Sequence, residues 1–298
     1  MTRFLVTGSE GQLGRSLVAR IANDAGAVLL GAFSHRDLDI STPGALATLL
    51  ETLPGGGPDV VINAAAFTAV DRCEEERGTA FRVNGEAPGQ LAVACREAGC
   101  RLIHVSTDYV FDGESPDPYS EDAPTAPRSV YGKSKLQGEQ AVLAAGEDAV
   151  VVRTSWVFGQ GHNFVGSILR QAAIRQAEES PAPLRVVVDQ QGAPTYADDL
   201  AQGILALYQR GATGLFHLCN SGSVSWYAFA RAILDQAGHR GLEIEPISTA
   251  ELDLPAPRPR YSLLDCSRAA SLGVQLRPWQ EALAAYLSSL SPQVDELT

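Results

Sequence analysis

Short apolar runs alternate with amphipathic stretches through the first half of the chain. The apolar runs show no polar alternation and cover residues 4–6, 28–33, 60–63, 102–106 and 150–153. The stretches with helical spacing between them cover residues 12–23, 43–53, 80–98 and 131–145. Strands that are buried on both faces and joined by helices are typical of a parallel sheet. The pattern therefore predicts an α/β fold with a Rossmann-like, doubly wound parallel sheet.

The second half of the chain is less regular and predicts a smaller C-terminal lobe. Its expected strands cover residues 184–188 and 215–218, and its expected helices cover residues 163–177, 198–208 and 226–237. We expect a larger domain over residues 1–155, to which residues 184–219 return. Residues 156–183 and 220–298 would form the smaller lobe, with a proline-rich, loop-rich cap over residues 245–259. Ligand sites prefer the crevice between such lobes.

Composition narrows the range of partners. The chain has 298 residues, 45% of them hydrophobic, and a net charge of −12. An acidic chain repels a phosphate backbone, so nucleic acid is not expected as a partner, and a phosphorylated ligand would need local donors. The five cysteines form no CxxC pair, which favours a reducing, cytoplasmic location. No stretch reaches the ~18 apolar residues of a membrane span, so no membrane partner is expected.

A glycine-rich turn follows the first expected strand. Gly8, Gly11 and Gly14 stand in the sequence GSEGQLG, directly before the first expected helix. Glycine lets the backbone approach a pyrophosphate closely, and the amides at a helix N-terminus bind the anion. In this strand–turn–helix setting the spacing predicts a dinucleotide site, which makes residues 1–155 the expected NAD(P)-binding domain.

The end of the second expected strand indicates which dinucleotide is bound. The sequence there is FSHR, without a carboxylate before Asp37. An acidic residue would bind the ribose of NAD, whereas an arginine accommodates the 2′-phosphate of NADP. Ser34 and Arg36 therefore favour NADPH, with NADH possible. Asp39 and Ile40 would flank the adenine, or Asp39 would serve as a turn residue.

A tyrosine and a lysine one helical turn apart form the expected catalytic pair. Tyr131 begins and Lys135 ends the stretch YGKSK, and Lys133 and Lys135 are the chain's only lysines. A tyrosine with a pKa of about 10 is a poor acid–base group near neutrality unless a neighbouring charge stabilises the phenolate. A lysine ammonium on the same helical face can do so.

A third catalytic group is expected at the end of the preceding strand. Ser106, Thr107 and Asp108 lie there, where active-site groups of open α/β sheets are placed. Alternation along the strand sends Ser106 and Thr107 to opposite sides, so one of the two hydroxyls would bind a substrate carbonyl together with Tyr131.

Together these motifs resemble the extended short-chain dehydrogenase/reductase superfamily and, within it, the dTDP-4-dehydrorhamnose reductase family. The matching stretches are GQLG at 11–14, NAAAFTAVD at 63–71, STDYVFDG at 106–113, YGKSK at 131–135, RTSWVF at 153–158 and GAPT at 192–195. The resemblance runs nearly the whole length of the chain.

The resemblance implies reduction of the 4-keto group of a dTDP-6-deoxy-hexulose to dTDP-L-rhamnose by NAD(P)H. It implies Tyr131 as the proton donor, Lys135 as its activator and Thr107 as the hydroxyl on the keto oxygen. The glycine turn, the end of the second strand and the resemblance together give the expected cofactor residues, which are Gly8, Gly11, Gln12, Leu13, Gly14, Arg36, Asp39, Ile40, Ala64, Ala65, Ala66, Tyr131 and Lys135. Those that the resemblance places against the substrate are Thr68, Val70, Thr107, Asp108 and Trp156.

Two other functions remain open at this stage. A regulatory subunit of methionine adenosyltransferase uses the same fold without catalysis, and another nucleotide-sugar reductase or epimerase would use similar chemistry. Some family members bind magnesium at a dimer contact through a glutamate after the glycine turn. Arg15 and Ser16 stand at that place here, so we expect no metal and a monomer or weak homodimer. Glu74, Glu75 and Glu76 are interpreted as a solvated helix face.

Overall fold

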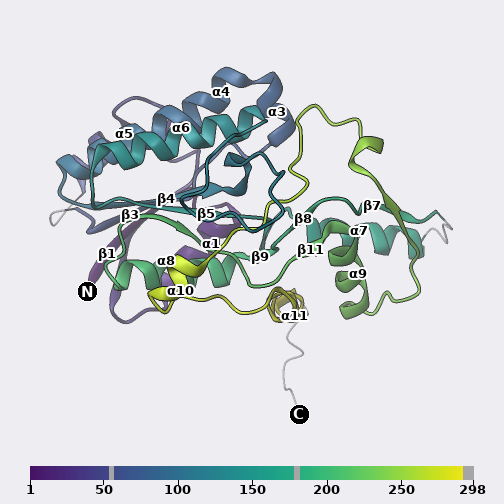
Figure 1. Ribbon diagram of the computed structural model, residues 1–298. Coiled ribbons are helices and arrows are strands. Elements are labelled where there is room, and N and C mark those ends of the chain that lie inside the picture. The colour runs from purple at the N-terminus through teal and green to yellow at the C-terminus, as the bar shows by residue number, and fades with distance from the viewer. Residues whose placement is uncertain (54–56, 178–181, 291–298) are drawn as a thin grey trace, which may run out of the picture.

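The computed structural model describes residues 1–53, 57–177 and 182–290. Its centre is a six-stranded parallel sheet with the order β10-β5-β4-β3-β1-β2 (Figure 1). The strands are β1 (Thr2–Thr7), β2 (Ala27–Phe33), β3 (Val60–Asn63), β4 (Arg101–Thr107), β5 (Val150–Thr154) and β10 (Gly214–His217). The first five coincide closely with the apolar runs and β10 with the strand expected over residues 215–218, and the Rossmann-like fold class is confirmed.

Helices cover both faces of the sheet, which is why its strands carry apolar side chains on both sides. One face is covered by α1 (Gln12–Ala22) and α8 (Ala197–Gln209), whose leucines and isoleucines pack on β1, β3 and β5. The other face is covered by α2 (Ala45–Thr52), α5 (Ala87–Glu97) and α6 (Val130–Ala145). Figure 1 shows these two helical layers on either side of the strands.

The strand order reverses next to β1. From β1 the chain passes to β2 on one side and then to β3 on the other. At such a switch point the loops after the strands diverge and leave a crevice at the carboxyl ends of the strands. The loops that follow β1 and β3 therefore form the walls of the natural ligand site.

The helix expected over residues 80–98 is interrupted. It consists of α4 (Arg77–Phe81), a π-helical turn, η1 (Arg82–Glu86), and α5. The side chain of Asn84, inside the π turn, accepts a hydrogen bond from the Phe67 amide (2.8 Å) and donates to the Phe67 carbonyl (3.0 Å). The turn thus fixes the loop after β3, next to the crevice.

A second lobe lies beside the sheet. It contains α7 (Phe164–Ala177), α9 (Trp226–Gln236) and α11 (Trp279–Leu290), which share one apolar core. β7 (Leu184–Val187) pairs with β12 (Ile244–Ile247) rather than with the central sheet. Within the segment 184–219, α8 packs on the central sheet and β10 is its edge strand, whereas β7 pairs with β12; the domain boundaries themselves stay a prediction.

The proline-rich segment also differs from its prediction. Pro246 lies inside β12, where an edge strand tolerates a missing amide because one side of it needs no partner. The smaller elements are β6 (Val157–Phe158), β8 (Gln191–Gly192), β9 (Thr195–Tyr196), β11 (Val224–Ser225), α3 (Val70–Glu75), α10 (Ser267–Ser271), η2 (Asp108–Val110) and η3 (Thr249–Glu251). Within the described ranges, no helix is long and apolar enough to span a membrane.

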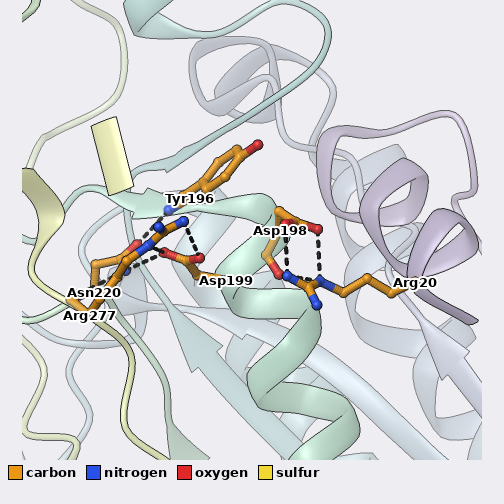
Figure 2. Close-up of polar contacts among 6 residues, drawn as sticks. All are labelled: Arg20, Tyr196, Asp198, Asp199, Asn220 and Arg277. Atoms are coloured by element: carbon orange, nitrogen blue, oxygen red, sulfur yellow. Dashed lines mark hydrogen bonds and ion pairs between the residues drawn. The ribbon is translucent and has the colours of Figure 1, made fainter. Parts of the chain in front are cut away.

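Neighbouring carboxylates at the start of α8 join three segments distant in sequence (Figure 2). Asp198 pairs with Arg20 of α1 at 2.7 Å, and Asp199 pairs with Arg277 at 2.7 Å. Asp199 also accepts a hydrogen bond from Asn220 (2.8 Å), and Asn220 in turn accepts one from the Tyr196 amide (2.7 Å). These contacts connect α8 to both the sheet domain and the C-terminal segment.

Candidate active site

A cavity of about 1120 Å³ lies at the carboxyl ends of the strands, at the switch point. Most residues predicted from the sequence line it: Gly8, Gly11, Gln12, Leu13, Gly14, Asp39, Ile40, Ala64, Ala65, Ala66, Thr68, Val70, Thr107, Asp108, Tyr131, Lys135 and Trp156. Arg36 is the exception, because its side chain is exposed outside this lining. The fold therefore brings the three groups of motifs to one place.

The glycine turn has the geometry that a pyrophosphate requires. Gly8 has a positive φ of 72°, and a Cβ there would come within 2.5 Å of the Ala65 amide nitrogen. A Cβ on Gly14 would overlap the carbonyl of Gly8. α1 begins at Gln12, and no side chain in the described ranges caps it, so its first amides face the cavity. This close-packed turn fits the phosphates of a dinucleotide.

The end of β2 is organised by Asp37. Its carboxylate accepts hydrogen bonds from the amide (2.9 Å) and the hydroxyl (2.7 Å) of Ser34, and these bonds lower the pKa of Asp37. The hydroxyl of Ser34 thus donates to Asp37, while the exposed Arg36 lies outside the lining of the cavity. Asp39 accepts from the amide and hydroxyl of Ser41, so it serves as a turn residue and also lines the cavity.

Tyr131 lies in the first turn of α6. The N-cap Ser129 accepts a hydrogen bond from the Gly132 amide (3.1 Å), which fixes the start of the helix. The ring of Tyr131 packs edge-on against Tyr109, with 5.4 Å between ring centroids. Burial raises the pKa of Tyr131, and the hydroxyl of Thr107 opposes the rise. The phenol is therefore protonated near neutral pH, as a proton donor must be.

Lys135 is one turn further along the same helix and is fully buried. Its Nζ donates to the carbonyl of Val105 (2.6 Å) and lies 3.4 Å from Nε2 of His104. Burial lowers the pKa of Lys135 to about 8, although Glu139 opposes this shift. The sequence predicted that Lys135 stabilises the phenolate of Tyr131. That role stays a prediction, since the contacts of Nζ in this structure are with β4.

Thr107 ends β4 beside Tyr131. Its hydroxyl donates to Oδ1 of Asp108 (3.0 Å) and accepts from the Tyr109 amide (3.3 Å). Ser106 also lines the cavity, but its buried hydroxyl has no hydrogen-bond partner among the described residues. Burial raises the pKa of Asp108 to about 6, while the hydrogen bond from Thr107 opposes the rise. Thr107 is the hydroxyl that lowers the pKa of the Tyr131 phenol, while the choice of Thr107 over Ser106 as the group on the substrate oxygen stays a prediction.

Two tryptophans form one wall of the cavity. Trp156 stacks face to face on Trp226, with 3.5 Å between ring centroids and 6° between planes. Trp156 is the one non-glycine residue in the described ranges with a positive φ, 47°. Gly192 leaves room for its ring, since a Cβ there would lie 2.5 Å from Cε2 of Trp156. A strained backbone held by packing is a frequent property of ligand sites.

Trp226 was missed by sequence reasoning. It opens α9, 70 positions after Trp156, and its Nε1 donates to Gln190 (3.1 Å). The sequence around Trp226 has the pattern of an ordinary amphipathic helix start, so it gives no sign that Trp226 lines a cavity. His104 was likewise seen only as part of a strand, and its contact with Lys135 needs the tertiary structure.

The acidic run at the end of α3, residues 74–76, has structural partners. Glu74 accepts a hydrogen bond from the Val130 amide (2.8 Å), and Glu76 pairs with Arg72 (2.6 Å). Within residues 1–53, 57–177 and 182–290, no group of three or more His, Cys, Asp or Glu side chains is placed to hold a metal ion.

Comparison with known proteins places the chain among sugar-nucleotide enzymes. The family model described as RmlD substrate binding domain matches residues 2–291. A dTDP-4-dehydrorhamnose reductase of Mycobacterium tuberculosis is 43% identical over 96% of this chain and 93% of its own length. A probable dTDP-4,6-dihydroxy-2-methyloxan-3-one 4-ketoreductase of Streptomyces antibioticus is 42% identical over 94% and 93%.

A solved structure agrees with these sequence matches. The dTDP-4-dehydrorhamnose reductase of Bacillus anthracis, in complex with NADP, superposes with a TM-score of 0.88 at 34% identity and covers 97% of this chain and 100% of that one. The resemblance drawn from the motifs is confirmed, and the chain belongs to the RmlD substrate binding domain family.

Proposed function

We propose that this chain reduces the 4-keto group of dTDP-4-dehydrorhamnose to give dTDP-L-rhamnose, with NADPH as the hydride source and Tyr131 as the proton donor. The observation that supports this most is the shared cavity, which places Tyr131, Lys135 and Thr107 beside the glycine turn. The naming of the Mycobacterium tuberculosis and Bacillus anthracis relatives supports the substrate, and the NADP complex of the latter supports the cofactor.

The cofactor would lie along the carboxyl edge of the sheet. The backbone of Gly8, Gly11 and Gly14 and the amides of α1 would hold its phosphates, and Ala64, Ala65 and Ala66 would line its other side. When bound, it supplies the hydride that reduces the carbonyl carbon. Since the chain carries a net charge of −12, these backbone donors would supply the local attraction for the anion.

The chain's own side chains would act on the oxygen of the reacting carbonyl. As negative charge develops there, the phenol of Tyr131 gives its proton to that oxygen, so an alcohol forms and a phenolate is left. The hydroxyl of Thr107 would position the oxygen beside the phenol. Asp108 and the Trp156–Trp226 wall would hold the sugar nucleotide and exclude water. Positioned acid catalysis of this kind is worth about 10²–10⁴-fold.

The substitution Tyr131→Phe tests the proton donor. We expect NADPH consumption with the dTDP-keto-sugar, generated in situ, to fall about 10²–10⁴-fold because the ring remains and the proton is lost. NADPH binding measured by calorimetry should be retained.

Tyr109→Phe is the matched control, because Tyr109 is half-buried, packs against the ring of Tyr131 and lines the same cavity. We expect it to stay within about a factor of ten of the unchanged chain. Near-normal turnover of Tyr131→Phe, or an equal loss in both variants, would contradict the assignment.

A second candidate is reduction of a different dTDP-4-keto sugar. The Streptomyces antibioticus relative, named for another 4-ketoreduction, is nearly as similar as the rhamnose reductases. Comparing kcat/KM for the two keto sugars would distinguish them, since the preferred substrate should be used at least tenfold more efficiently. Net consumption of NADPH would also exclude an epimerase and a non-catalytic regulatory subunit.

A further inference from the structure

A chain of buried polar side chains connects three strands of the sheet to Lys135. Thr7 donates to Oδ1 of Asn63 (2.7 Å), and Nδ2 of Asn63 lies 3.0 Å from Nδ1 of His104. Nε2 of His104 then lies 3.4 Å from Nζ of Lys135. The side chains of Asn63, His104 and Lys135 are all essentially inaccessible to solvent. Buried polar groups of this kind need defined donors and acceptors.

The orientation of the Asn63 amide is fixed by the backbone. The amide N–H of Ala65 donates to Oδ1 of Asn63 (3.1 Å), so that atom must be the oxygen. The nitrogen of the Asn63 amide therefore faces Nδ1 of His104 and can only donate to it. Nδ1 must accept, which puts the proton of a neutral imidazole on Nε2.

The imidazole stays neutral. Burial holds the pKa of His104 well below its usual value of 6.5, and the positive charge of Lys135 acts in the same direction. The Nε2–H group of His104 consequently points at Nζ of Lys135. Two donors facing each other are unfavourable, whereas an N–H group can donate to the lone pair of a neutral amine.

The other groups around Lys135 are few. Glu139, one turn further along α6, favours the ammonium, but it forms two hydrogen bonds to Arg153 (2.9 and 2.7 Å) that neutralise its charge. Tyr131, one turn earlier, is protonated. The Val105 carbonyl of β4 accepts from Nζ in either protonation state. Among these neighbours, His104 is therefore the one whose contact with Lys135 is favourable for the neutral amine and unfavourable for the ammonium.

We infer that His104 is a positioning residue, whose Nε2–H group donates to the neutral amine of Lys135 and so lowers the proton affinity of that side chain. The inference rests on the proposed function, in which Lys135 is one of the catalytic residues. The ammonium form would instead place two donors against each other at this contact, so loss of His104 should favour the ammonium.

The two lysines of the chain make a direct test possible. Labelling lysine with ¹³C at Cε gives two signals, one from Lys135 and one from the exposed Lys133, which serves as an internal reference. In His104→Leu we expect the titration midpoint of Lys135 to rise by about one pH unit, a tenfold gain in proton affinity. The midpoint of Lys133 should not move.

His217→Leu is the matched control. His217 is also buried, on β10, and contacts Arg153 rather than Lys135. We expect the Lys135 midpoint in this variant to equal that of the unchanged chain. This titration needs no turnover, so its result is independent of whether the proposed substrate is correct.

The tautomer of His104 gives a second measurement, made on the unchanged protein. Imidazole ¹⁵N shifts should show a proton on Nε2 of His104 and none on Nδ1. A proton on Nδ1 would overturn the inference even if His104→Leu failed to fold. An unchanged or lower Lys135 midpoint in a folded His104→Leu protein would also overturn it.

Discussion

Asp108 and Tyr131 show how burial sets the chemistry of single residues in this site. Both line the same cavity, and burial raises the pKa of each. Raising the pKa of a tyrosine keeps it a proton donor, whereas raising that of an aspartic acid brings its titration close to neutral pH. The two groups therefore respond to pH in different ranges, although they share one environment.

We expect Asp108→Asn to stabilise the protein at high pH. The native pKa of about 6 lies above the usual 3.8, so between these values the native state binds more protons than the unfolded state. The stability contributed by burying the neutral acid is complete below about pH 4 and is lost as the pH rises through about 6. The amide stays neutral, so the variant should gain about 3 kcal/mol at pH 8.

Urea denaturation of both proteins at pH 4 and pH 8 checks this prediction. The gain should nearly disappear at pH 4, where the unchanged carboxyl is protonated in the native state and close to half protonated in the unfolded state. A difference in unfolding free energy that is the same at the two pH values would contradict the assigned pKa.

At the scale of elements, the turn between β1 and α1 shows why glycine is needed in particular places. Gly8 has a left-handed backbone and lies against the backbone of Ala65, in the loop after β3. Two separate properties require glycine at position 8. A positive φ favours glycine wherever it occurs in a chain, whereas the contact with the Ala65 backbone excludes a side chain at this position in particular.

Gly8→Ala and Gly211→Ala separate these constraints. Both glycines have a φ near 70°, but a Cβ on Gly211 has nothing within 4 Å. We expect each variant to lose about 1–2 kcal/mol of stability from the backbone angle. Gly8→Ala should in addition weaken NADPH binding at least about tenfold, because the loop of Ala65 must move.

Calorimetric titration with NADPH and thermal unfolding measure these two effects independently. Unchanged NADPH affinity in Gly8→Ala would mean that the turn does not hold the cofactor.

At the scale of the whole molecule, two adjacent carboxylates connect different parts of the chain. Asp198 pairs with Arg20 near the surface, while Asp199 is buried and receives hydrogen bonds from Arg277 and Asn220 (Figure 2). Exposed ion pairs contribute little to the free energy of unfolding. Removing one partner of a buried, hydrogen-bonded ion pair lowers that free energy much more.

We therefore expect Asp199→Asn to lower the free energy of unfolding by about 2–3 kcal/mol. Asp198→Asn, one position earlier, should lower it by about 1 kcal/mol or less. Chemical denaturation of the two variants gives the comparison. Equal losses would mean that the Arg277 contact is no stronger than a surface pair.

The sequence by itself determined the strands of the central sheet, the glycine turn and the pairing of Tyr131 with Lys135 on one helical face. Each of these is local: a buried parallel strand must be apolar throughout, a tight turn needs glycine, and residues four apart on a helix share a face.

The tertiary structure alone decided the pairing of β7 with β12, the stack of Trp226 on Trp156 and the contact of His104 with Lys135. These contacts join segments 31 to 70 positions apart, so no local pattern specifies them. The direction of the Lys135 side chain also depends on the tertiary structure, because its Nζ donates to the carbonyl of Val105 in β4. Packing of the sheet against α6 therefore determined the charge environment at the centre of the site.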